Sequence, residues 1–452
     1  MTTRIDAALH QVSDTRCLRI GAGVLASVTE VLSQCYEQRA AVVVADENTF
    51  SAAGKLVNEQ LQAAGRTIGA PIIFPGTPPL YADFDHVLVL EEAFRTHDAI
   101  PVVVGSGTLN DLTKLAAYRA NRQYLCVATA ASMDGYTAFG AAITKAGFKQ
   151  TMACPAPRAV IADLDVLAQA PPELKASGYG DLLGKVTAGA DWLLADALEL
   201  EPIDRRAWSL VQESLRAWTA HPDRLRDGDP QALSDLFEGL TLTGLAMQLS
   251  ASSRPASGSE HRFSHLWEMQ SGPVAALHGF KVGVGTIAAA ALYERLLARD
   301  LTRLDIAKCC RAWPSRTEVE RAVRQGHDHP QLAEQAVAES LAKYIDASRL
   351  RQRLLLLQER WPALREQLQA QLLPADQLQS LLQAAGCPTE PTEIGVSWPQ
   401  LKASYHLART IRSRYTVLDL VAETGLRSEL VEELFAPGGF WARPPTLKSL
   451  RP

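Results

Sequence analysis

The stretch VVVGSGTLND, residues 102–111, decides the fold. Its valines predict a buried strand, and a helical pattern follows over residues 110–120. Gly105 and Gly107 allow backbone N–H groups to approach a phosphate, and the start of the helix adds a positive dipole end. Because the third glycine of G-x-G-x-x-G is absent, the pattern fits a dinucleotide pyrophosphate site and a tight structural turn about equally well.

The alternation of strand and helix continues on both sides of this stretch. Strand-like runs at 40–45, 69–74 and 123–128 alternate with helical patterns, which predicts crossover units and a parallel sheet. Beyond Pro171-Pro172 nearly every apolar run has helical period. We therefore expect an α/β, Rossmann-like dinucleotide-binding domain at residues 1–170 and an all-α metal- and substrate-binding domain at residues 171–452.

Composition narrows the classes of partner. The 452 residues are 47% hydrophobic and 21% charged with a net charge of −5, so no basic excess exists to bind a nucleic acid. No stretch reaches the roughly 18 apolar residues of a membrane span. The seven cysteines form no C-x-x-C pair, which favours reduced thiols and a cytoplasmic location.

Two further loops place polar groups at predicted strand ends. Asp46 follows the strand at 40–45, where a carboxylate can bind an adenosine ribose; a helix N-cap explains it equally well. The segment TAASMDGY, residues 129–136, follows the strand that ends at Ala128. Its small and hydroxyl side chains can line a cofactor groove, and Asp134 can bind a substrate hydroxyl. A Ser/Asp/Gly turn is the commoner reading of such a segment.

The most specific group of residues lies in the second half. His261 and His265 are spaced i, i+4, which puts both imidazoles on one face of a helix that includes them. His278 follows, and Asp181 precedes them just before another helical run. One carboxylate and two imidazoles suit a divalent metal with an open position for substrate. A lone H-x-x-x-H is more often an ordinary pair, but the nearby third histidine favours metal.

Two cations flank this group. Lys185 lies one turn beyond Asp181 on the same helix face, and Arg262 lies between the two motif histidines. Either side chain can meet a substrate phosphate. A solvated surface arginine explains Arg262 at least as well, so Lys185 carries slightly more weight as a substrate-binding residue.

Taken together, these segments resemble the sn-glycerol-1-phosphate dehydrogenase family, especially its bacterial AraM-type branch, within the dehydroquinate synthase-like and iron-dependent alcohol dehydrogenase superfamily. The resemblance runs in order over most of the chain and is weakest between residues 315 and 400. The matching stretches are GSGTLNDLTKLAAYR (105–119), TAASMDGYTAFGAAI (129–143), PRAVIADLDVL (157–167), GYGDLLGKVTAGADW (178–192), GSEHRFSHLWEM (258–269), LHGFKVGVGT (277–286) and IRSRYTVLDL (411–420).

The resemblance implies reversible reduction of dihydroxyacetone phosphate to sn-glycerol 1-phosphate with NAD or NADP, one divalent metal ion (zinc, nickel or iron) and a homodimer. It implies that Asp181, His261 and His278 bind the metal. It also implies that Asp134 and His265 contact the substrate, with Asp181 at the reacting centre. The implied NAD(P)-binding positions, with Gly105 of the same loop added to them, are Asp46, Gly107, Thr108, Asp111, Thr129 and Ser132.

Three positions depart from the family pattern, and two of them, Ala138 and Phe280, keep a non-catalytic reading open. Ala138 replaces a cofactor-contacting serine, Phe280 replaces a glutamate that commonly follows the His-Gly pair, and Arg262 replaces what is often a histidine. The alternatives are a dehydroquinate-synthase-like cyclase, a dehydrogenase of another polyol, and a non-catalytic nucleotide-binding paralogue. Net consumption of the nicotinamide, a panel of ketones and metal analysis distinguish them.

Overall fold

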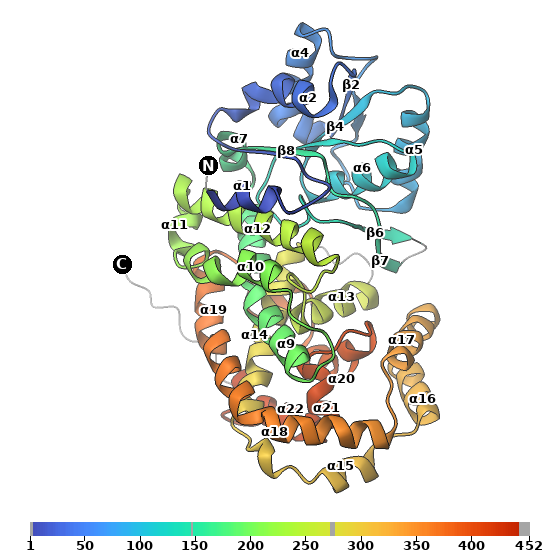
Figure 1. The fold of residues 1–452 in the computed structure, drawn as a ribbon, viewed down its shortest axis with the longest axis vertical. Helices are drawn as coiled ribbons and strands as arrows, with labels where there is room; N and C mark the ends of the chain where they lie inside the picture. Colours follow the sequence, from blue (N-terminus) through green and yellow to red (C-terminus); the bar gives the residue numbers. More distant parts are fainter. Residues whose placement is uncertain (1–2, 146–147, 272–275, 443–452) are drawn as a thin grey trace.

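The computed structural model describes residues 3–145, 148–271 and 276–442, with the strands in the first part of the chain and helices after them (Figure 1). A parallel six-stranded sheet has the order β1-β8-β5-β4-β2-β3. Its strands are β1 (Cys17–Gly21), β2 (Ala41–Asp46), β3 (Ile72–Phe74), β4 (Ile100–Gly105), β5 (Leu125–Ala128) and β8 (Ala159–Asp163).

The sheet is buried on both faces, as expected for parallel strands between helices. Along β4, Val103 packs into one hydrophobic cluster, while Val102 and Val104 pack into another. The first cluster includes α5 (Phe84–Arg95) and α6 (Gly107–Arg119). The second includes α2 (Val28–Tyr36) and α4 (Lys55–Ala63). Continuous valine runs are therefore required on these strands.

The predicted alternation is confirmed, with two differences. The helix after the glycine loop begins at Gly107 rather than at residue 110. The sequence reading missed β1 and β8, and it missed a separate antiparallel hairpin of β6 (Ala141–Lys145) and β7 (Phe148–Met152). The strand β1 pairs with β8, from Cys17 opposite Ala159 to Gly21 opposite Asp163, so this pairing depends on segments far apart in the sequence.

After β8 the described chain is helical. The division near residue 170 falls between α7 (Leu164–Gln169) and α8 (Pro172–Leu183), and as a domain boundary it stays a prediction. The helices that build the site are α9 (Lys185–Ala197), α12 (Pro230–Ser250), α13 (Ser259–Ser271), α14 (His278–Leu297) and α17 (Pro330–Ala342). Farther from the sheet lie α18 (Ala347–Gln371), α20 (Trp398–Leu407) and α21 (Val417–Glu423) (Figure 1).

Two glycines let α8 approach its neighbours at backbone distance. A Cβ on Gly178 would lie 1.9 Å from the carbonyl oxygen of Ala131, in the loop after β5. A Cβ on Gly279, at the start of α14, would lie 1.7 Å from the carbonyl oxygen of Ser177. Glycine is needed at both positions because neither backbone carbonyl can move aside. These contacts bring the loop after β5, α8 and α14 together.

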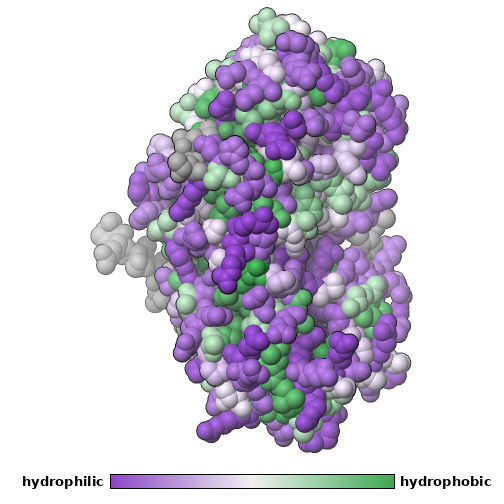
Figure 2. All heavy atoms as spheres, in the orientation of Figure 1, coloured by the Kyte–Doolittle hydropathy of each residue, from purple (hydrophilic) through white to green (hydrophobic). Residues whose placement is uncertain are grey.

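The face shown in Figure 2 is mainly hydrophilic, with hydrophobic side chains scattered among the polar ones. Among the described residues, no helix has the length and apolar character needed to cross a membrane.

Candidate active site

Two cavities lie at the carboxyl ends of the strands, on either side of the glycine loop. The larger has a volume of about 690 Å³ and extends from this loop to α13, α14 and α17. The smaller, of about 460 Å³, extends from the loop to the end of β2. Ser106, Thr108 and Leu174 line both cavities, so the two are neighbours along one groove. In open α/β sheets this edge is where ligands bind.

Most of the predicted cofactor positions line this groove. Asp46 and Thr129 line the smaller cavity, and Thr108 lines both cavities. The predicted cofactor positions that line the larger cavity alone are Gly107, Asp111 and Ser132. Gly105 lines neither: it is buried in β4, and a Cβ there would lie 2.7 Å from the Cβ of Leu109. Its place indicates a packing contribution to the loop rather than contact with a ligand.

Asp46 and Asp111 also hold local structure. Asp46 is the N-cap of α3 (Glu47–Thr49): its Oδ1 accepts from the backbone N–H of Thr49 at 2.7 Å. The N-cap alternative is therefore correct, and because Asp46 also lines the smaller cavity, its other oxygen can still accept from a ligand. Asp111 accepts from the backbone N–H of Ala142 at 3.0 Å, which ties the β6–β7 hairpin to α6.

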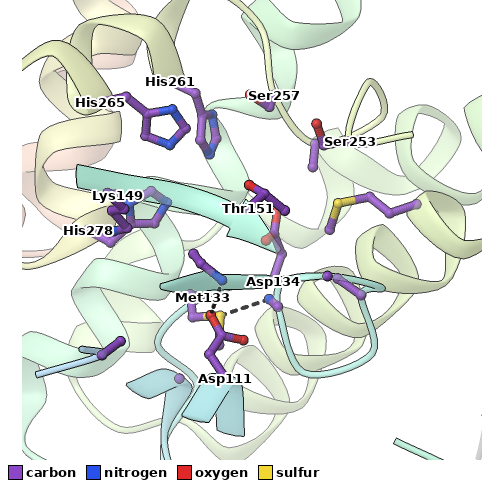
Figure 3. A pocket seen from close by; sticks show the side chains of 18 of the residues that line it. Asp111, Met133, Asp134, Lys149, Thr151, Ser253, Ser257, His261, His265 and His278 are labelled. Atoms are coloured by element: carbon purple, nitrogen blue, oxygen red, sulfur yellow. Dashed lines mark hydrogen bonds between the residues drawn. The ribbon is translucent and has the colours of Figure 1, made fainter. Parts of the chain in front are cut away.

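The structure brings Asp181, His261 and His278 together from three helices. One ligand atom from each lies within 4.8 Å of the others. The Nε2 of His261 is 3.6 Å from the Oδ1 of Asp181. Figure 3 shows His261 and His265 projecting from the same helix toward the cavity. The i, i+4 spacing places both on α13 as predicted, and the close packing of α8 on α14 supplies the other two side chains.

A carboxylate lies behind each of the two histidines. Glu260 Oε1 is 2.8 Å from the Nδ1 of His261, and Glu268 Oε1 is 3.7 Å from the Nδ1 of His278. Such carboxylates commonly orient metal-binding histidines and fix the tautomer that leaves Nε2 free. Glu268, on α13, places a carboxylate beside His278 although Phe280 replaces the glutamate expected on α14 itself.

Asp134, Asp181 and Lys185 form a buried group that we call the acidic end. The Lys185 Nζ is 2.7 Å from both the Oδ2 of Asp134 and the Oδ1 of Asp181. Burial raises the pKa of Asp134, as does the neighbouring Asp181 carboxylate. Burial also acts to raise the pKa of Asp181, but Lys185 and the two histidines outweigh it and lower that pKa to about 2. Because the acidic end has two carboxylates and one ammonium group, it carries a surplus of negative charge.

His265 lies beside the same group. Its ring centroid is 5.9 Å from that of His261 and 6.3 Å from that of His278. Burial lowers the pKa of the His265 imidazole well below its usual value, and the positive charge of Arg412 acts in the same direction. A neutral imidazole can donate from one nitrogen and accept at the other.

The two cations considered for phosphate binding are engaged elsewhere. Lys185 is fully buried between two carboxylates. Arg262 is also buried, where its Nη1 donates to the carbonyl oxygens of Arg409 and Arg412 at 3.3 and 3.2 Å. Neither lines the cavity. Ala138, which replaces a serine of the family pattern, does line the cavity. The serine hydroxyl that this chain lacks would therefore lie at the groove.

The donor set fits a divalent metal. Tetrahedral sites with ligand bonds of about 2.0–2.1 Å place ligand atoms roughly 3.4 Å apart, close to the 3.6 Å between Asp181 Oδ1 and His261 Nε2. Both Asp181 oxygens already accept hydrogen bonds, from Lys185 Nζ and from the backbone N–H of Asp134. Each keeps a second lone pair, and the surplus negative charge favours a cation.

Comparisons with known proteins agree with this geometry. A family model described as iron-containing alcohol dehydrogenase matches residues 19–171. The glycerol-1-phosphate dehydrogenase [NAD(P)+] of Geobacillus thermodenitrificans is 30% identical over 383 residues, which cover 83% of this chain and 85% of that protein. The chain belongs to the glycerol-1-phosphate dehydrogenase family. The family member from Halalkalibacterium halodurans is 38% identical over 258 residues, 56% of this chain and 64% of its own.

Solved structures extend the family's fold to nearly the whole chain. Glycerol dehydrogenase from Schizosaccharomyces pombe has a TM-score of 0.59 at 16% identity and covers 98% of both chains. A probable glycerol dehydrogenase from Sinorhizobium meliloti has the same TM-score at 14% identity and covers 93% of this chain and 97% of its own. The predicted architecture, a parallel-sheet domain followed by helices, is the fold of these dehydroquinate synthase-like enzymes.

The sequence reading missed four charged residues of the site: Lys149, Glu260, Glu268 and Arg412. Glu260 and Glu268 lie inside the quoted segment GSEHRFSHLWEM, next to His261 and three residues after His265. The rule that a carboxylate supports each metal-binding histidine could have singled them out. Lys149 and Arg412 reach the cavity from a hairpin and a loop, so spacing along the sequence gives no signal for them.

Proposed function

We propose that this chain reversibly reduces dihydroxyacetone phosphate to sn-glycerol 1-phosphate with NADH or NADPH and a bound zinc, nickel or iron ion. One observation carries the proposal. Asp181, His261 and His278 lie together, and the two histidines line a cavity that adjoins the predicted nucleotide groove. The names of the relatives, glycerol-1-phosphate dehydrogenase [NAD(P)+], supply the substrate and the cofactor.

The roles of the chain's own residues follow from their positions. Asp181, His261 and His278 would hold the metal, which when bound supplies Lewis acidity at the substrate oxygen. Lys185 keeps Asp134 and Asp181 in place with two short contacts. Asp134 and His265 line the same cavity and would bind substrate oxygens, with His265 donating or accepting a proton at a ring nitrogen. The glycine loop would orient the cofactor against the substrate.

A spectrophotometric assay tests the proposal. Purified protein supplied with zinc, nickel or iron should oxidise NADH or NADPH when dihydroxyacetone phosphate is added, and the product should be the sn-glycerol 1-phosphate enantiomer. A cyclase would return the hydride and leave the nicotinamide absorbance unchanged. Formation of the opposite enantiomer, or turnover only with unphosphorylated ketones, would contradict the substrate assignment.

The choice between NAD and NADP is part of the proposal and rests on Asp46. A carboxylate at a strand end binds a free ribose 2′-hydroxyl and repels a 2′-phosphate. Asp46→Asn keeps an N-cap side chain and removes the charge, so folding should be nearly unchanged. The KM for NADH should rise several-fold relative to that for NADPH. Equal KM ratios in both forms would show that Asp46 serves the helix alone.

The remaining parts of the proposal concern assembly and location. We expect a homodimer, which light scattering after size-exclusion chromatography would show directly. A cytoplasmic location and the division into residues 1–170 and 171–452 likewise stay predictions. Fractionation of cells and limited proteolysis near Pro171 would test them.

A further inference from the structure

The larger cavity has two basic side chains in its lining apart from histidines, Lys149 and Arg412. They differ in what they contact. The Nζ of Lys149 is 3.0 Å from Glu268 Oε2, and Glu268 is also bound by Lys281 at 2.7 Å. Within residues 3–145, 148–271 and 276–442, the guanidinium of Arg412 makes no hydrogen bond and no ion pair. Its donors are therefore available to a ligand.

Arg412 is held by its backbone rather than by its side chain. It lies in the motif IRSRYTVLDL, between a turn that ends at Thr410 and the start of α21. Its carbonyl oxygen accepts from Arg262 Nη1 at 3.2 Å, and the carbonyl oxygen of Tyr415 accepts from Arg254 Nη1 at 3.0 Å. Two buried arginines thus fix the loop, while Arg412 lines the cavity and its guanidinium has no hydrogen-bond or ion-pair partner among the described residues.

The loop that carries Arg412, together with the side chains that bind its backbone, holds surplus positive charge, and Arg412 is its member that lines the cavity. We call this region the basic wall, and its members are Arg254, Arg262, Lys343, Arg409, Arg412 and Arg414. The carboxylates within ion-pair distance of them are Asp419 and Glu201. Burial lowers the pKa of Arg414 to about 10, and the positive charges of Arg254, Arg262 and Arg412 act in the same direction. Glu339, which also lines the cavity, opposes this charge but makes no ion pair with Arg412.

The cavity is therefore bipolar. Asp134 of the acidic end lines one part of its wall, with Asp181 and Lys185 fully buried next to it, and Arg412 lines another part. His265 lies close to both, since it contacts the rings of His261 and His278 and its pKa responds to Arg412. A ligand that fits both ends has a neutral oxygen for the metal side and an anion for the arginine.

We propose that Arg412 binds the phosphate of the substrate and so sets the preference for phosphorylated over free ketones. This inference rests on the proposed function, which names dihydroxyacetone phosphate. Arginine presents five donors in a planar fork that matches two phosphate oxygens at once. Lys185, which the sequence favoured, is excluded from this task because its ammonium is already shared by two carboxylates.

The test compares three variants with the wild type. Arg412→Gln removes the positive charge proposed to bind the phosphate, and Lys149→Gln removes the other cation of the cavity. Arg360→Gln is the matched control, because Arg360 of α18 forms an exposed ion pair with Glu199. The measured quantity is kcat/KM for dihydroxyacetone phosphate divided by kcat/KM for dihydroxyacetone. Arg412→Gln should lower this ratio roughly 10- to 100-fold, mainly through the KM of the phosphate ester. Arg360→Gln should leave the ratio unchanged.

A binding measurement separates this inference from the proposed function. Inorganic phosphate should raise the melting temperature of the wild type and of Arg360→Gln, but not that of Arg412→Gln. If no variant or wild type reduces dihydroxyacetone phosphate while this pattern persists, the reaction is wrong and the arginine site stands. If Arg412→Gln keeps the ratio and the phosphate effect, or Lys149→Gln alone loses both, the inference is overturned. Arg412→Lys keeps the positive charge but lacks the planar guanidinium, so its ratio of kcat/KM values should lie between those of the wild type and Arg412→Gln. This variant tests the inference even if Arg412→Gln folds poorly.

Discussion

Two aspartate–lysine pairs, each with a buried aspartate, have the same lysine–aspartate distance and different surroundings. Lys185 and Lys343 each place Nζ 2.7 Å from an aspartate Oδ1, that of Asp181 and of Asp419 respectively. Burial acts to lower the pKa of both ammonium groups. Asp134 and Asp181 overcome it at Lys185, whose pKa is raised. At Lys343 the single carboxylate does not, and the pKa is lowered to about 7.

The difference comes from the neighbours and not from the pair. Lys185 is one cation between two carboxylates, whereas Asp419 is one carboxylate among Lys343, Arg262 and Arg409. A surplus of negative charge can hold a metal ion, and a surplus of positive charge can support an anion site. The same ion pair thus contributes to opposite ligand chemistry in the acidic end and in the basic wall.

The largest effect is expected at the acidic end. His261→Ala or His278→Ala removes one of three protein ligands, so metal retention should be lost and turnover should fall by about 1,000-fold or more. Metal content after desalting and the rate of NADH oxidation measure the two effects. The melting temperature without metal should fall more in His261→Ala than in His278→Ala, because His261 lies 2.8 Å from the buried Glu260 carboxylate whereas His278 lies 3.7 Å from that of Glu268. A variant that keeps its metal and full activity would show that the histidine is not a ligand.

Removing the shared lysine should come next. Lys185→Met leaves two buried carboxylates facing each other, and breaking a buried pair costs about 3–5 kcal/mol in the free energy of unfolding. Urea denaturation measures the loss. Because a dication can replace the missing charge, added zinc should stabilise this variant more than the wild type. Lys402→Met, at an exposed pair with Glu432, is the control and should cost less than about 1 kcal/mol. Equal losses in the free energy of unfolding of the two variants would show that Lys185 is not needed to neutralise Asp134 and Asp181.

These two experiments address residues that the sequence could name. Asp181, His261 and His278 were predicted because one carboxylate and two imidazoles suit a divalent metal and because the family resemblance implies these ligands, and the glycine loop after a valine run predicted the nucleotide edge. Arg412 and Glu339 could not be predicted, because they reach the cavity from a loop and from α17 through contacts between distant segments. The two glycines of the α8 contacts are visible in the sequence, but only the structure shows which carbonyls they approach.

Replacing the lysine of the basic wall, Lys343, by methionine should lower the free energy of unfolding less than Lys185→Met does. In Lys343→Met, Asp419 keeps Arg409 at 3.4 Å, Arg262 at 3.6 Å and the backbone N–H of Thr416 at 3.1 Å. No buried carboxylate is left without a partner, so the loss should be about 1 kcal/mol. Urea denaturation at pH 7 beside Lys185→Met gives the comparison. A loss as large as that of Lys185→Met would mean that Lys343 alone neutralises Asp419.

The sharpest test of the basic wall is the dependence of the free energy of unfolding on pH. Burial lowers the folded-state pKa of Lys343 to about 7, while an unfolded lysine has a pKa of about 10.4. Between these values the unfolded chain binds more protons than the folded one, so the free energy of unfolding should rise with pH, by at most about 1.4 kcal/mol per pH unit. Lys343→Arg cannot lose its proton in this range and should lack this contribution. Denaturation curves at pH 7, 8 and 9 measure the slopes. Parallel slopes for wild type and Lys343→Arg would show that Lys343 stays charged in the folded protein, because Asp419 then outweighs burial and the two arginines, as Asp134 and Asp181 do at Lys185.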